Sequence, residues 1–123
     1  MEKCEGWVAV WISTIDSYEE LEEYADDTWN SNGEVDSSPF EKDFCFGWYD
    51  IDTREFDTVE GTKTFSEMFN RISYKDKFID KLLIDLENYN PLKFRSFMTI
   101  FDTKYHGNGQ TDKAVFIGNY KYN

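Results

Sequence analysis

The chain has 123 residues, 40% of them hydrophobic, and is therefore long enough to bury a core as a single domain spanning residues 1–123. Its 25 acidic and 13 basic residues give a formal net charge of −12, which argues against a nucleic-acid partner because phosphate binding needs a basic patch. No apolar run approaches the roughly 18 residues of a membrane-spanning helix, and two cysteines provide no disulfide framework. The sequence predicts a cytoplasmic protein with no membrane partner.

The negative charge is concentrated in the first half of the chain. Residues 1–61 hold 18 acids and three bases, whereas residues 62–123 hold seven acids and ten bases. No lysine or arginine occurs between Cys4 and Glu41. A chain that is acidic only for solubility would spread its charge more evenly. The asymmetry therefore predicts a cation or a basic protein as the partner.

The first predicted elements are a strand and an acidic helix. Residues 6–12, GWVAVWI, form a short apolar run rich in β-branched and aromatic residues, which predicts a strand covered on both faces. Residues 17–29 follow a helical pattern, and Ser17 with Glu20 is typical of a capping box. The outer face of this helix would carry Glu19, Glu23, Asp26 and Asp27. No lysine one turn away pairs with these acids, and such a break with local rules tends to mark a functional surface.

Two further helices are predicted downstream. Residues 30–39 are rich in turn-forming residues and predict a loop, after which Ser38 and Pro39 predict the start of a short helix over 39–46. The segment that follows is compatible with a strand or with irregular structure. A helix over 73–90 is predicted from its repeating apolar stripe, with Ser73 as its cap and Pro91 at its end.

The last elements are two strands, over 94–105 and 114–122, joined by a loop with two glycines. Together with the 6–12 strand they predict an antiparallel sheet covered by the three helices. The fold class is therefore α+β.

Few residues offer chemistry. His106 is the only histidine and lies in the Gly-containing loop, Cys45 between two phenylalanines is expected to be a buried thiol, and neither cysteine has a Cys-x-x-Cys partner. The segment starting at Asp50 and Asp52 begins like a calcium loop, but it places Glu55 where Gly belongs. We therefore predict no catalytic residue, no metal site and no cofactor.

A resemblance to a known family rests on several strings of the sequence. VAVWI, SYEELEEY, SPFEKDF, WYDID and the closing AVFIGNYKY together resemble the immunity protein 22 family of bacterial polymorphic toxin systems. The residues that match the most specific string are Ser38, Phe40, Asp43, Phe44, Trp48, Tyr49, Asp50 and Asp52. The chain departs from the family pattern at Ser13 and Cys45, where Gly is usual, and at Thr53, where Phe is usual.

The resemblance implies a non-enzymatic immunity protein that binds and neutralises a cognate toxin protein. An acidic surface suits a basic toxin, for example a nuclease, because opposite charges accelerate association. Phe40, Phe44 and Phe46 are expected to anchor the SPFEKDF segment in the core, whereas Trp48 and Tyr49 could be core or interface. The predicted partner-binding residues are Glu19, Glu23, Asp26, Asp27, Trp48, Asp50 and Asp52.

Two alternatives stay open from the residues alone. One is a small-ligand or Ca²⁺-binding module, which would need a convergent pocket. The other is a carboxylate-based hydrolase, which would need two acids about 5–10 Å apart in a cleft.

Overall fold

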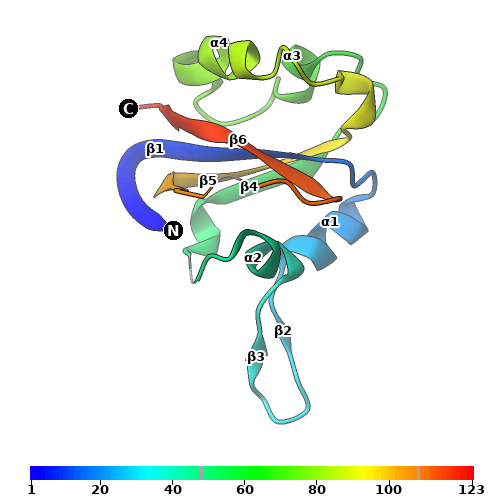
Figure 1. Cartoon of the computed structure of the whole chain (residues 1–123), viewed down its shortest axis with the longest axis vertical. Helices are drawn as coiled ribbons and strands as arrows, with labels where there is room; N and C mark the ends of the chain where they lie inside the picture. Colours follow the sequence, from blue (N-terminus) through cyan, green and yellow to red (C-terminus); the bar gives the residue numbers. More distant parts are fainter. Residues whose placement is uncertain (48, 108) are drawn as a thin grey trace.

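The computed structural model describes residues 1–47, 49–107 and 109–123, and its centre is a four-stranded antiparallel sheet of order β4-β5-β1-β6 (Figure 1). The strands of this sheet are β1 (Glu2–Ser13), β4 (Arg54–Thr58), β5 (Ser96–Lys104) and β6 (Ala114–Lys121). The helices are α1 (Tyr18–Ala25), α2 (Pro39–Phe44), α3 (Phe65–Met68) and α4 (Lys75–Asp85), with 3₁₀ turns at Ile51–Thr53 and Pro91–Lys93. A separate hairpin consists of β2 (Thr28–Trp29) and β3 (Val35–Asp36). The predicted α+β class is confirmed.

Helices cover both faces of the sheet, and β1 lies inside it. Helices α3 and α4 pack on one face and α1 and α2 on the other, while the β2–β3 hairpin projects away from the α1 and α2 side (Figure 1). Strand β1 pairs with β5 and with β6, as the sequence predicted for residues 6–12. Val8 and Val10 face α4, whereas Ala9 and Trp11 face α2. The run lacks polar alternation because both of its faces are buried.

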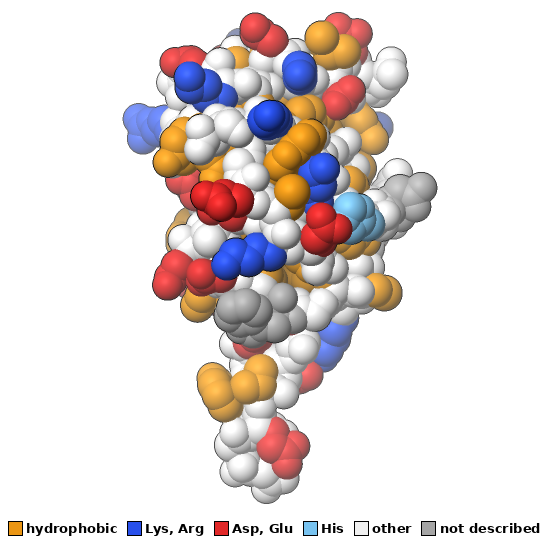
Figure 2. All heavy atoms as spheres, turned by 90° about the vertical axis from the view of Figure 1, so that its left-hand side faces the viewer, with side chains coloured by type: hydrophobic (Ala, Val, Ile, Leu, Met, Phe, Trp, Pro, Cys, Tyr) orange, Lys and Arg blue, Asp and Glu red, His pale blue; other side chains and the backbone are white. Residues whose placement is uncertain are grey.

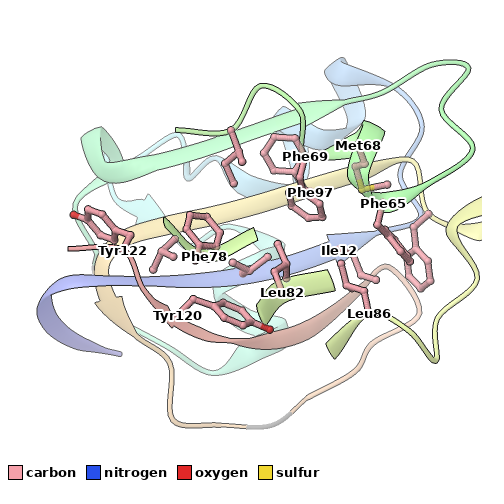
Figure 3. Close-up of a cluster of buried hydrophobic side chains, with 14 of the residues drawn as sticks. Ile12, Phe65, Met68, Phe69, Phe78, Leu82, Leu86, Phe97, Tyr120 and Tyr122 are labelled. Atoms are coloured by element: carbon pink, nitrogen blue, oxygen red, sulfur yellow. The ribbon is translucent and has the colours of Figure 1, made fainter. Parts of the chain in front are cut away.

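The α3 and α4 side of the sheet holds one hydrophobic cluster (Figure 3). Phe78 and Leu82 of α4 and Leu86 at its C-cap repeat at four-residue spacing, so they share the face that packs on the sheet. The other side chains labelled in Figure 3 are Ile12, Phe65, Met68, Phe69, Phe97, Tyr120 and Tyr122. The apolar stripe therefore identified this helix correctly.

The predicted ends of that helix are wrong. Residues 73–90 were expected to be helical, but α4 spans only Lys75–Asp85. Ser73 does not cap the helix, because its hydroxyl donates to Glu55 Oε2 at 2.7 Å and its amide donates to Glu55 Oε1. The cap position is held by Tyr74 in the left-handed region, with φ 58° and no side-chain capping bond. Pro91 begins a 3₁₀ turn instead of ending the helix.

The opposite side of the sheet is built around Trp11, which is fully buried. The Trp11 and Phe40 rings meet edge-to-face with centroids 5.0 Å apart and planes at 85°. Phe44, Phe46 and Tyr49 are also buried, so the aromatic anchoring of the SPFEKDF segment is confirmed and Tyr49 belongs to the core. Cys45 was expected to be a core thiol but is exposed, because it caps α2 in the left-handed region with φ 54°.

Helix α1 is shorter than predicted, and this changes the position of two acids. A helix was expected over 17–29, but α1 ends at Ala25, and Asp26 caps it in an extended conformation. Ser17 does cap the start, accepting a hydrogen bond from the Glu20 amide at 3.1 Å. Beyond Ala25 the chain turns outward and forms β2. Helix α2 ends at Phe44, two residues before the predicted 46.

Candidate functional site

The charge asymmetry of the sequence becomes a difference between the two faces of the sheet. Residues 14–53 cover the Trp11 side and hold 13 acids and one lysine, and we call them the acidic layer. Residues 60–95 cover the α4 side and hold six acids and seven bases. The acidic layer includes α1, α2 and the hairpin in the lower half of Figure 1. The excess negative charge therefore lies on one side of the molecule.

The outer face of α1 is an exposed part of the acidic layer. Its four glutamates are exposed, and in the part of the chain that the structure describes none of them forms a salt bridge. These glutamates are Glu19, Glu20, Glu22 and Glu23. The helix buries Leu21, Tyr24 and Ala25 on its inner face, so its fold does not depend on the glutamates. Repulsion between like charges one turn apart costs a few tenths of a kcal/mol per pair.

Asp26 and Asp27 serve the fold, contrary to the expectation that they lack local partners. Asp26 forms a salt bridge with Arg54, whose guanidinium also donates to the Ala25 carbonyl and to Tyr49 Oη, both at 3.0 Å. Asp27 Oδ1 accepts a hydrogen bond from the Ser38 amide at 3.0 Å. Arg54 thus binds the end of α1 to β4, and Asp27 joins the two strands of the hairpin at their base. Their role as partner contacts remains a prediction.

Glu41 is the buried member of this cluster, with 8% of its surface exposed. Its pKa is raised from 4.5 to about 7, first by burial and then by a hydrogen bond with the Asp27 carboxyl, while Arg54 acts in the opposite direction. Burial also raises the pKa of the Tyr49 hydroxyl. Asp26, Asp27, Glu41, Tyr49 and Arg54 together form what we call the arginine cluster. Sequence reasoning missed it, because Arg54 and Asp26 are 28 residues apart.

A Glu41→Gln variant is expected to be about 2 kcal/mol more stable than wild type at pH 8 and to differ little at pH 4.5. In wild type the folded pKa of about 7 exceeds the ordinary value of 4.5, so the folded state binds the proton more tightly. Stability is therefore lost as the pH rises between these two values. Glutamine stays neutral, and its amide can donate to Asp27. The measurement is urea unfolding across this pH range.

The control for this variant is Glu22→Gln, at an exposed position of α1. It removes the same charge without removing a buried carboxyl. Parallel stability curves for wild type and Glu41→Gln across the pH range would contradict the assignment of a raised pKa to Glu41.

Asp50 and Asp52 are exposed and lie at the start of a 3₁₀ turn, not on a strand as one interpretation had it. The Asp50 carboxylate accepts a hydrogen bond from the Asp52 amide at 3.0 Å, so one acid caps the turn and the other projects from it. Arg54 directly follows this turn and binds the end of α1. Trp48, the remaining predicted contact, lies outside the described residues.

The β2–β3 hairpin is a candidate surface that was not predicted from the sequence. Residues 30–39 were predicted to be a loop, yet Val35 and Asp36 pair with Trp29 and Thr28 in antiparallel register. Trp29 and Val35 lie opposite each other and are 71% and 52% exposed. A turn sequence flanked by Thr-Trp and Val-Asp is a hairpin signal that could have revealed this element. The hairpin was not predicted because the helix over residues 17–29 was expected to include Thr28 and Trp29, which form β2.

The described residues provide little for catalysis or metal binding. In residues 1–47, 49–107 and 109–123 there is no group of three or more His, Cys, Asp and Glu side chains arranged to hold a metal ion. His106 is exposed, and its Nε2 lies 2.7 Å from Glu2 Oε2. A shallow groove of about 700 Å³ runs between β4 and α3, but its Glu55 carboxylate is bound to Ser73. Within these described ranges, no helix has the length and apolar character that a bilayer crossing requires.

Comparison with known proteins gives one clear relationship. No curated protein and no solved structure matches the chain significantly. The sequence profile of the immunity protein 22 family matches residues 8–123, nearly the whole length of the domain. This range includes all of α1, the hairpin, α2 and the arginine cluster. The chain therefore belongs to the immunity protein 22 family.

Proposed function

We propose that the chain is a non-enzymatic immunity protein that binds and neutralises a cognate polymorphic toxin through its acidic layer. Family membership supports a role in toxin immunity. The observation that supports the acidic layer as the contact surface is the separation of charge between the two faces of the sheet, with 13 acids and one lysine on one side. The complementary toxin would be basic, as a nuclease active site is.

Electrostatics gives this arrangement a physical advantage. A layer with one sign of charge attracts an oppositely charged cleft and can raise association rates to roughly 10⁸ M⁻¹s⁻¹ at low salt. Inhibition then needs only occupation of the cleft, so no catalytic group is required. The proposal includes a cytoplasmic location, which the free thiols Cys4 and Cys45 support because reduced cysteines are usual there.

The test begins by sequencing the genes that flank the gene of this chain, where we expect a toxin gene. The toxin domain is then produced alone and together with the chain in a bacterial host. We expect the chain to restore growth, to form a stable complex and to abolish toxin activity at a one-to-one ratio. The toxin recovered from the complex should have an unchanged intact mass. Failure to bind would contradict the proposal, and neutralisation by far less than one equivalent would contradict a non-enzymatic role.

A further inference from the structure

We propose that the β2–β3 hairpin is the element that enters the toxin, with Trp29 as its apolar anchor and Val35 beside it. The occupant is the cognate toxin domain, at an apolar pocket bordered by lysine or arginine side chains. This inference rests on the proposed function and adds the contact element to it.

Exposure of the hairpin's apolar pair is the first observation. Trp29 is 71% exposed and Val35 is 52% exposed, and their backbones pair directly across the hairpin. Figure 2 shows hydrophobic side chains on the narrow lower part of the molecule. The contact of an exposed tryptophan with its cross-strand neighbour contributes at most about 1 kcal/mol to folding, whereas tryptophan is among the residues that contribute most to protein interfaces.

Order in the hairpin loop is the second observation. The Asn30 side-chain oxygen accepts hydrogen bonds from the Asn32 and Glu34 amides at 2.9 and 3.0 Å. The Asn30 amide donates to the Glu34 carbonyl at 2.9 Å, and Gly33 adopts φ 78°, which glycine accepts without strain. The loop is therefore closed by bonds of its own, although a two-stranded hairpin in water is marginally stable by itself.

The base of the hairpin supplies the missing support. Asp27, just before β2, accepts a hydrogen bond from the amide of Ser38, which follows β3. Lys42 of α2 forms a 2.8 Å salt bridge with Asp36 of β3. The preceding residue, Asp26, is bound by Arg54 of β4. The first contact joins the two strands of the hairpin at their base, and the other two connect this base to α2 and to β4. Pre-organisation of this kind lowers the entropy cost of inserting a side chain into a partner.

Charge decides which partner fits. Residues 26–37 contain four acids and no lysine or arginine. Arg54 pairs with Asp26 and Lys42 with Asp36, so the negative charge beside the apolar pair comes from Asp27 and Glu34. A second copy of this chain would bring the same acids and a net charge of −12 into contact with them. Like charges facing each other oppose such self-association, whereas a pocket rimmed by cations satisfies both the apolar pair and the carboxylates.

The test compares two double variants for binding to the catalytically inactive toxin domain encoded beside this chain. Trp29→Ala with Val35→Ala removes the hairpin pair. Ile84→Ala with Leu92→Ala is the matched control, since these residues are 62% and 56% exposed on the opposite side of the sheet. We expect the hairpin variant to bind about 100-fold more weakly, mainly through faster dissociation, and the control to bind within about threefold of wild type.

Hydrogen exchange in the complex provides a second readout, with slower exchange expected for the amides of residues 28–36. Equal binding by wild type and both variants would overturn the hairpin inference and leave the proposed function standing. Wild type that fails to bind would overturn both. A hairpin variant that loses only self-association, measured by sedimentation, would assign the pair to a dimer contact and also overturn the inference. Circular dichroism confirms that each variant is folded.

Discussion

Arg54→Met is expected to lower the free energy of unfolding by about 3 kcal/mol, because it removes the one cation that holds the arginine cluster together. The guanidinium serves three acceptors: the Ala25 carbonyl, Tyr49 Oη and the Asp26 carboxylate. Methionine has similar length and fills the space but offers no donor. Asp27 and the buried Glu41 would then interact without the opposing effect of Arg54, and the Glu41 pKa would rise further.

The measurement is urea unfolding of wild type and Arg54→Met at pH 7. Arg54→Lys is expected to recover only part of the loss, because one ammonium cannot reach acceptors on three residues with the geometry of a planar guanidinium. Arg71→Met is the control, since Arg71 is exposed on the other side of the sheet. A loss below about 1 kcal/mol for Arg54→Met, equal to that of the control, would show that the cluster contributes little.

The elements that sequence analysis identified correctly are those whose signals are local. The 6–12 run is apolar on both alternating faces, so its burial inside the sheet followed from composition alone. The start of α2 was predicted correctly because Ser38 and Pro39 are adjacent capping signals. The Ser38 hydroxyl accepts a hydrogen bond from the Glu41 amide at 3.1 Å. The presence of helix α4 was predicted correctly because its apolar residues recur every four positions, which is also a local signal.

The errors occur where a distant residue decides the local structure. Ser73 was predicted to cap a helix, but Glu55, 18 residues away, binds its hydroxyl. Asp26 was placed in a helix, but Arg54, 28 residues away, binds its carboxylate. A capping box or an acidic helix pattern contains no information about such partners. The hairpin was hidden by the same error, since its first strand was assigned to the end of the helix.

The string that supported the family resemblance is mainly structural. Ser38, Phe40 and Phe44 are buried, and the Asp43 carboxylate accepts a 2.7 Å hydrogen bond from Tyr24 Oη. These residues position α2 and the base of the hairpin. The string therefore identifies the fold, whereas the exposed surface beside it, including the hairpin and α1, is the part that we propose contacts the toxin.

Neutralising the four glutamates of α1 is expected to slow association with the toxin about tenfold at low salt and to flatten its salt dependence. The variant carries Glu→Gln at 19, 20, 22 and 23. The sequence predicted Glu19, Glu23, Asp26 and Asp27 as the contact residues of this helix, but Asp26 binds Arg54 and Asp27 binds Ser38, so removing these two would disturb the fold. The four glutamates are exposed, and the loss of first-turn acids is offset by relief of repulsion, so stability should change by less than about 0.5 kcal/mol.

The matched control removes four exposed acids from the other side of the sheet, at Glu60, Asp76, Asp80 and Glu87. Both variants change the net charge equally, so a general charge effect would slow both alike, whereas a local acidic contact would slow only the α1 variant. Association rates measured by stopped flow at two salt concentrations distinguish a general charge effect from a local acidic contact. The dissociation rate should change little, because charges at the rim of an interface act mainly on the association rate. Removal of Trp29 and Val35 is expected to have the opposite effect and to change mainly the dissociation rate. Unchanged association by the α1 variant would mean that steering comes from Asp50 and Asp52 or from the hairpin acids.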